Sequence, residues 1–234
     1  MVLLTTETLH HAFFAREVGA HFPWAKILVE TKTFRPPFET GHAFEKTRED
    51  IESDRFFERH PVSLRSMSDV LVVESMNSRS ALDELEKLKP DVILVFGTGK
   101  LSSAVIDLCP EGIINLHGGD PEEYRGLDTH LWAVYHHDFS GLATTLHRLN
   151  AALDDGEIIL KQSIPLTKGM KLAELRAANT QVCVELALAG LDMFARSKGF
   201  DSRPQSKRGR YYSFMPACLK DICVRRFEAY TEKL

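Results

Sequence analysis

The sequence predicts an α/β protein with a Rossmann-like, mostly parallel sheet that carries helices on both faces. Short apolar runs alternate with longer amphipathic stretches through the first half of the chain, which is the order expected of successive β-α-β units. One run, residues 91–96 (DVILVF), is apolar at nearly every position. Such a run is typical of a strand covered on both faces, as in a parallel sheet with helices on each side.

The individual elements follow from local patterns in the first half of the chain. The expected strands are residues 2–5, 26–30, 70–73, 91–96 and 112–116, and the expected helices are residues 7–20, 43–59, 80–89 and 102–108. Between them, residues 32–41 contain Pro36, Pro37 and Gly41 and are expected to form a loop.

The pattern changes in the second half. Residues 143–149 alternate in polarity and residues 157–163 follow after a turn, so we expect two edge strands joined by a loop. Residues 171–197 carry apolar side chains at three- and four-residue steps, typical of a long helix facing the core. The remaining chain is more polar. We therefore expect one domain over residues 1–200 and a short C-terminal tail or appendage over residues 201–234.

Composition excludes several classes of function. The 234 residues are 44% hydrophobic, enough for a substantial core, and contain no apolar run long enough to span a membrane. The 29 basic and 33 acidic residues argue against non-specific nucleic-acid binding. Without a recognisable secretion signal, four reduced cysteines and a cytoplasmic location are expected. Cys218 and Cys223 lack a histidine at zinc-ligand spacing, so no metal site is expected.

A candidate site begins where residues 112–116 end. Asn115 and His117 lie two apart in this expected strand and therefore point to the same face. They stand at its carboxyl end, where open α/β sheets bind ligands. Gly118 and Gly119 follow directly and allow close approach of a ligand. An amide beside an imidazole can donate hydrogen bonds to an oxygen that develops negative charge.

A carboxylate completes the pattern. Asp154 lies in the turn Asp154-Asp155-Gly156, and a carboxylate next to His117 raises the basicity of the imidazole and orients it. We expect Asp154 to help remove the proton from an attacking amine. Each motif alone is explained by turn or strand-end chemistry. Together they fit acyl transfer to an amine.

At these residues the sequence resembles the folate-dependent formyltransferases, which include enzymes acting on glycinamide ribonucleotide, methionyl-tRNA and amino sugars. The matching segments within Asp91–Gln162 are Ile113–His117, Tyr124–Gly126, Thr144–His147 and Leu153–Ile158. The resemblance implies a formyltransferase fold and 10-formyltetrahydrofolate as co-substrate, without a metal. It places the family's catalytic residues on Asn115, His117 and Asp154. With the catalytic carboxylate placed first in the turn, we expect Asp154 to stay ionised and to pair with His117 directly or through water, while Asp155 points to solvent.

The resemblance also implies a folate pocket in which backbone groups of two loops hold the pterin ring. The residues expected there are Phe96, Gly97, Gly99, Leu101, Asn150 and Leu153. A phosphate loop is a weaker interpretation of residues 97–100, because the spacing is too short and no Ser or Thr follows the lysine. The family often has proline directly after the catalytic histidine. Gly118-Gly119 departs from this, and a more pliable loop is expected.

The acceptor is narrowed by comparison within the family. Methionyl-tRNA formyltransferases carry a C-terminal barrel. We expect the residues after Gln162 to be too few to form one, because the expected helix uses many of them. The glycinamide ribonucleotide enzymes have a Gly-Ser-Asn type loop after the first strand, which Thr5–Thr8 does not match. The resemblance therefore favours a nucleotide-linked amino sugar, commonly a 4-amino-4,6-dideoxy sugar of lipopolysaccharide or glycan biosynthesis.

The segment Tyr124–Trp132 resembles the sugar branch most. Tyr124, Arg125, Gly126 and His10 are expected to contact the substrate, with Arg125 near a phosphate; for Arg125 a surface-loop role is equally open. Other small amines such as glycinamide ribonucleotide, a formyl-folate hydrolase and a non-catalytic folate- or nucleotide-binding relative remain alternatives. The oligomeric state is open, with a homodimer as one option.

Overall fold

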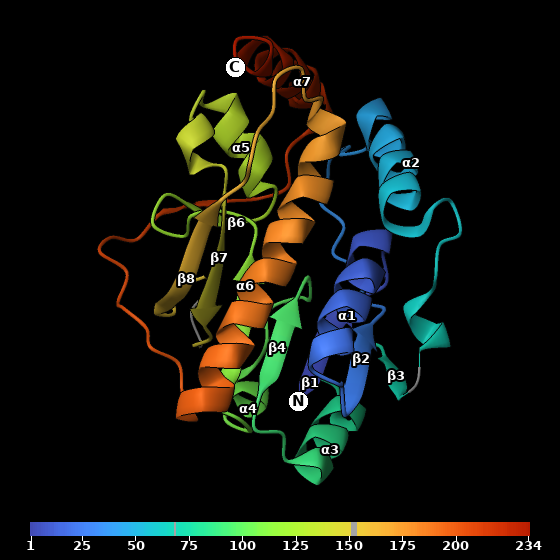
Figure 1. The fold of residues 1–234 in the computed structure, drawn as a ribbon, viewed down its shortest axis with the longest axis vertical. Coiled ribbons are helices and arrows are strands. Elements are labelled where there is room, and N and C mark those ends of the chain that lie inside the picture. Colours follow the sequence, from blue (N-terminus) through green and yellow to red (C-terminus); the bar gives the residue numbers. More distant parts are fainter. Residues whose placement is uncertain (68, 151–153) are drawn as a thin grey trace.

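The computed structural model describes residues 1–67, 69–150 and 154–234, which form a layered α/β fold around one large sheet (Figure 1). Its strands run in the order β3-β2-β1-β4-β5-β7-β8. Strands β3, β2, β1, β4 and β5 pair in parallel with their neighbours. Strand β7 pairs antiparallel with both β5 and β8. The strands of this sheet are β1 (Val2–Thr6), β2 (Lys26–Glu30), β3 (Val70–Val73), β4 (Ile93–Phe96), β5 (Ile113–His117), β7 (Ala143–Arg148) and β8 (Ile158–Ser163).

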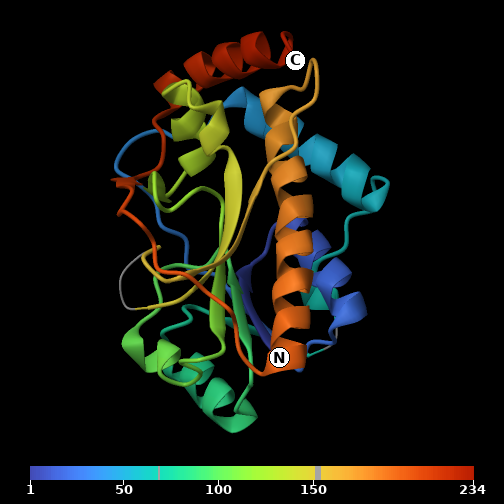
Figure 2. The same ribbon diagram turned by 60° about the vertical axis from the view of Figure 1, so that its left-hand side comes forward.

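Helices cover both faces of the sheet, and each face has its own core (Figure 2). The helices are α1 (Leu9–His21), α2 (Ala43–Phe57), α3 (Arg79–Leu88), α4 (Ser103–Ile106), α5 (Thr129–Tyr135), α6 (Leu175–Ser197) and α7 (Ala217–Thr231). Helices α1 and α6 pack over one face, with Phe14 and Leu186 among the buried side chains. Helices α3 and α4 cover the other, with Leu85 and Val105 buried there.

The α/β fold class and the mostly parallel sheet are confirmed, and the sheet corrects one detail. Residues 143–149 were expected to form an edge strand, but β7 lies inside the sheet between β5 and β8. Its alternation reflects two different buried surroundings rather than one solvent-facing side, because Ala143–His147 are all buried. Only β8 forms that edge of the sheet.

The C-terminal segment is folded onto the rest of the molecule. The expected tail forms β9 (Arg210–Tyr212), which pairs in parallel with β6 (Tyr124–Gly126), and helix α7, which packs against α5. Cys223 and Phe227 of α7 are fully buried in a third core cluster. The two residues lie four apart, a helical spacing, although only a short tail or appendage was expected here. A boundary at residue 200 therefore does not separate two independent cores.

Among the helices that the structure describes, none is both long enough and apolar enough to cross a bilayer.

Candidate active site

A pocket of about 540 Å³ opens at the carboxyl ends of β4 and β5, the edge at which open α/β sheets bind ligands. Asn115, His117 and Asp154 line it together. The sequence prediction that these three side chains meet at a strand end therefore agrees with their placement. Their catalytic role stays a prediction.

Asn115 is held by a histidine on the neighbouring strand. The pairing of β5 with β7 sets Asn115 opposite His147, and the Asn115 Nδ2 lies 3.0 Å from the His147 Nε2. The other ring nitrogen, Nδ1, donates to the Arg148 carbonyl at 2.8 Å. This tautomer leaves Nε2 as the acceptor, so one amide hydrogen of Asn115 is used and the second is available to a ligand.

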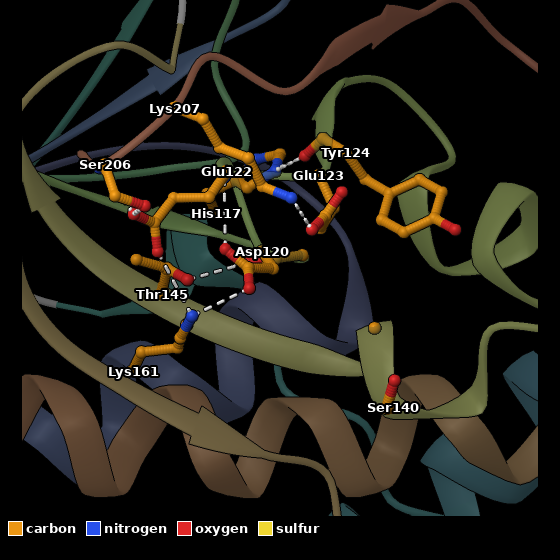
Figure 3. Close-up of polar contacts among 12 residues, drawn as sticks. His117, Asp120, Glu122, Glu123, Tyr124, Ser140, Thr145, Lys161, Ser206 and Lys207 are labelled. Carbon is orange, nitrogen blue, oxygen red and sulfur yellow. Dashed lines mark hydrogen bonds and ion pairs between the residues drawn. The ribbon is translucent and has the colours of Figure 1, made fainter.

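The His117 ring is fixed on one side and faces a carboxylate on the other. Its Nε2 donates to the Tyr124 carbonyl at 2.8 Å (Figure 3). Its Nδ1 lies 3.7 Å from the Asp154 Oδ1, and both side chains are less than a tenth exposed. The Asp154 carboxylate thus faces the Nδ1 of the ring in a buried setting that water screens weakly.

Asp154 is held in a backbone conformation that non-glycine residues seldom adopt. Its φ is +49°, in the left-handed region. The Asp154 Oδ2 accepts from the Gly126 amide at 2.8 Å. The Gln205 side chain donates to the carbonyls of Asp154 at 3.0 Å and of Gly156 at 2.9 Å. The turn is therefore secured by β6 and by the C-terminal segment.

The loop after His117 is held at several points, which differs from the expected pliable loop. The Thr129 hydroxyl donates to the Gly118 carbonyl, and the Thr145 hydroxyl donates to the Gly119 carbonyl at 2.8 Å. A Cβ at Gly119 would lie 2.9 Å from the His117 Nε2. The second glycine therefore makes room for the imidazole.

Acidic side chains farther along this loop anchor it to β8 and to the C-terminal segment (Figure 3). Lys161 of β8 lies 2.7 Å from Asp120, and the Ser206 hydroxyl donates to Glu122 at 2.7 Å. Arg203 also pairs with Glu122, at 2.8 Å. These contacts hold the pKa of Glu122 well below its usual range, mainly through the Arg203 hydrogen bond.

Two further histidines near His117 are kept neutral. Burial lowers the pKa of His147 to about 4, against the opposing effect of Asp154. Burial likewise lowers the pKa of His130 to about 4, and its Nε2 donates to the Ala143 carbonyl at 2.8 Å. Near neutral pH these rings therefore act as fixed dipoles.

The loop between β4 and α4 is shaped by residues from β2 and from the segment after β3. Gly97 has a φ of +84°, and a Cβ there would lie 2.3 Å from the His11 Nε2, so only glycine fits. The buried Glu30 accepts from the Gly99 amide at 2.8 Å. Asn77 donates to the Lys100 carbonyl at 2.9 Å. A flat ring can therefore approach a preformed backbone.

Most residues expected to bind folate or substrate line this pocket. Tyr124 and Arg125 do not, and Leu153 is not among the described residues. Those that line it are His10, Phe96, Gly97, Gly99, Leu101, Gly126 and Asn150. The Tyr124 side chain turns to Asp138, at 3.0 Å. Arg125 lies against Asp155, at 3.6 Å. Tyr124 thus contributes its carbonyl to His117 rather than its ring to the pocket.

Asp155 also lies differently from the expectation that it points to solvent. Its carboxylate is 3.3 Å from Arg208 and 3.6 Å from Arg125, and its side chain is one third exposed. It forms ion pairs that tie the turn to the C-terminal segment, which a local turn pattern cannot reveal.

Several residues that shape the site were not identified from the sequence. His147, Glu30 and Gln205 support site residues, and Arg48, Arg176 and Lys220 line the pocket with charge. His147 had one signal, because Thr145 and His147 alternate on β7 with the same period as Asn115 and His117 on β5. The pairing register of the two strands was needed to use it.

Within the described ranges 1–67, 69–150 and 154–234, no three His, Cys, Asp or Glu side chains are grouped as a metal site requires. Independence from metal stays a prediction.

Comparison with known proteins decides the family. The family model described as Formyl transferase matches residues 46–186, which is more than half of the chain and includes all three candidate catalytic residues. The chain belongs to the formyl transferase family. Methionyl-tRNA formyltransferase of Porphyromonas gingivalis is 30% identical over 156 residues, covering 66% of this chain and 48% of that protein. The chain thus spans under half the length of such curated relatives.

Solved structures of formyltransferases share the fold. A sugar N-formyltransferase from Shewanella sp. FDAARGOS_354 matches with a TM-score of 0.63 at 12% identity, over 91% of this chain and 76% of that one. The formyltransferase PseJ from Anoxybacillus kamchatkensis matches with a TM-score of 0.52 at 18% identity, over 91% and 86%. At these identities the likeness concerns the fold.

Proposed function

We propose that this member of the formyl transferase family transfers the formyl group of 10-formyltetrahydrofolate to the amino group of a nucleotide-linked amino sugar, with a 4-amino-4,6-dideoxy sugar as the preferred class. The observation that carries the proposal is that Asn115, His117 and Asp154 line one pocket at the end of β5. An amide, an imidazole and a buried carboxylate are the groups that acyl transfer to nitrogen requires.

Each of the three residues has a defined part in the proposed reaction. Formyl-folate supplies an electrophilic formyl carbon. Asn115 Nδ2 and protonated His117 Nδ1 donate to the formyl oxygen, which gains negative charge as the amine adds. Asp154, 3.7 Å from the His117 Nδ1, stabilises the imidazolium and accepts the amine proton directly or through water. The new C–N bond to the acceptor replaces the C–N10 bond of the folate, and the proton finally resides on N10.

The pocket fits a folate in its apolar surface and its exposed backbone. Val95, Leu101 and Ile106 contribute apolar lining, while the loop beginning at Gly97 offers backbone groups to the edge of a flat ring. We assign Phe96, Gly97, Gly99, Leu101 and Asn150 to this contact. Glu30 supports the loop from behind through the Gly99 amide.

Two observations favour a nucleotide-linked sugar as acceptor. PseJ, which shares the fold, is known as a complex with UDP-4,6-dideoxy-4-formamido-L-AltNAc and tetrahydrofolate. In this chain Phe214 lines the pocket and stacks on Phe34, with the ring centroids 6.0 Å apart. Phe34 is 72% exposed, and its ring offers the kind of flat surface on which nucleobases stack.

Methionyl-tRNA is the second candidate acceptor, because curated relatives at about 30% identity carry that name. The formal net charge of −4 favours the sugar over tRNA, since tRNA binding depends on clustered basic residues. Both acceptors would receive the formyl group by the same chemistry, so an assay with each acceptor distinguishes them.

The test is formylation by the purified protein, with 10-formyltetrahydrofolate as donor, of a panel of nucleotide-linked 4-amino sugars, glycinamide ribonucleotide and methionyl-tRNA. We expect turnover with an amino sugar and none with tRNA. Efficient tRNA formylation would reject the sugar assignment and keep the formyl chemistry. Formate release without any acceptor would favour a hydrolase, and binding of folate without any reaction would favour a non-catalytic relative. Light scattering on the same samples measures the oligomeric state, for which a homodimer is one option.

A further inference from the structure

A second set of charged side chains lines the active-site pocket, supplied by α2, α6 and α7. Arg48 comes from α2, Arg176 from α6 and Lys220 from α7, and all three line the pocket together with Glu45 and Asp128. The proposed transfer chemistry uses none of these side chains. Three cations in a partly enclosed pocket require either carboxylate partners or an anionic ligand.

Two of the three cations are already neutralised within the protein. Lys220 is 2% exposed and donates to Glu45 at 2.8 Å and to the Thr40 carbonyl at 2.5 Å. Arg176 forms a two-point contact with the fully buried Glu52, at 2.5 and 2.7 Å. These pairs give the pocket a rigid wall and little net charge.

Arg48 is the exception. Its Nε is buried and donates to no hydrogen-bond acceptor among the residues that the structure describes, and within the same residues no carboxylate oxygen lies within 4 Å of its guanidinium. The guanidinium packs 5.6 Å from the Phe44 ring centroid. Burial, and next the charge of Arg176, lower the pKa of Arg48. A partly buried guanidinium without a carboxylate partner can form charged hydrogen bonds with an anionic ligand.

The surroundings of Arg48 favour an anion despite the acidic residues nearby. The Glu45 charge is taken up by Lys220. Asp128 accepts from the Met215 amide at 2.8 Å, and burial raises its pKa. Burial, and next the neighbouring His11, keep the pKa of His10 well below its usual value. His10 therefore stays neutral and can still donate one hydrogen bond.

We propose that Arg48 binds a phosphate group of the acceptor and so positions the acceptor's amine at Asn115 and His117. The planar guanidinium matches phosphate oxygens in a two-point contact. This inference rests on the proposed function, because it names how that acceptor is recognised. Arg125, expected from the sequence to lie near a phosphate, is turned toward Asp155 instead.

The first test measures binding without catalysis. Inorganic pyrophosphate is titrated calorimetrically into wild type, Arg48→Gln, Arg48→Lys and the control Arg79→Gln, which removes an equally charged side chain from an exposed pair with Asp83 on α3. We expect Arg48→Gln to weaken binding about 10- to 100-fold, as loss of charged hydrogen bonds does. Arg48→Lys is expected to fall between, and Arg79→Gln to match wild type. Thermal unfolding of each variant verifies folding.

Equal pyrophosphate affinity in wild type and folded Arg48→Gln, or no binding to wild type, would overturn the proposal. Since this titration needs no acceptor, its result is independent of whether any sugar is formylated. The second test is kinetic. Arg48→Gln is expected to raise KM for the acceptor and leave KM for 10-formyltetrahydrofolate unchanged. A rise confined to the folate KM would assign Arg48 to the anionic tail of the folate and reject the acceptor assignment.

Discussion

Replacing Asp154 by asparagine isolates the contribution of its charge, because the structure lets the shape survive. Asparagine, like aspartate, tolerates the left-handed φ of +49° better than most non-glycine residues. Its side-chain oxygen can still accept from the Gly126 amide, and the Gln205 contacts go to backbone carbonyls. The substitution is therefore expected to lower the free energy of unfolding by about 1 kcal/mol, the difference between a charged and a neutral hydrogen-bond acceptor.

The effect on catalysis follows from the contact with His117. Two unit charges about 4 Å apart interact by about 4 kcal/mol at an effective dielectric constant of about 20, and the Asp154 Oδ1 lies 3.7 Å from the His117 Nδ1 with both side chains buried. Protonated His117 donates to the developing oxyanion, so removing the Asp154 charge destabilises the transition state. Turnover should fall about 10²- to 10³-fold.

The assay compares Asp154→Asn with Asp155→Asn at saturating substrates. Among the described residues, Asp155 pairs with Arg125 and Arg208, at 3.6 and 3.3 Å, and it is partly exposed. Its replacement should cost at most about 1 kcal/mol of stability and keep most activity. Folate binding by Asp154→Asn, followed by fluorescence quenching, should remain. Turnover of Asp154→Asn within about tenfold of wild type, or an inactive Asp155→Asn beside an active Asp154→Asn, would refute the assignment.

Three further predictions follow from the site. His117→Ala should lower kcat about 10²- to 10³-fold, the usual cost of one oxyanion donor, and near-normal kcat would remove His117 from the mechanism. Burial lowers the folded-state pKa values of His130 and His147 to about 4, so the unfolded chain binds more protons than the folded one below about pH 6.5. The free energy of unfolding, measured in urea, should therefore fall as the pH is lowered from about 6.5 toward 4. A free energy of unfolding that does not change over this range would contradict the prediction. Activity should persist after chelator treatment and dialysis, whereas loss reversed by zinc would establish a metal requirement.

The order of the expected strands and helices was sufficient to predict the class of fold. Continuous apolar runs such as residues 91–96 require helices on both faces, and the two-residue spacing of Asn115 and His117 requires that they share a face. These are properties of neighbours along the chain, so they can be read without tertiary structure.

The folding of the last residues was predicted less well, and the reason is physical. Helix α7 has Cys223 and Phe227 at helical spacing, but a short amphipathic helix becomes stable only on the core that it covers. Here that core includes α5, a helix the sequence reading did not identify. The inner position of β7 is a similar case, since alternation cannot distinguish an edge strand from one between two others.

By itself, then, the sequence determined the α/β class and the chemical nature of Asn115, His117 and Asp154, because both follow from residue type and spacing. Only the tertiary structure decided what surrounds them. It set His147 against Asn115 through strand register, turned Tyr124 and Arg125 away from the pocket, and brought Arg48, Arg176 and Lys220 into it from three separate helices. Contacts between residues so far apart in the chain depend on how the layers pack, and no local pattern encodes them.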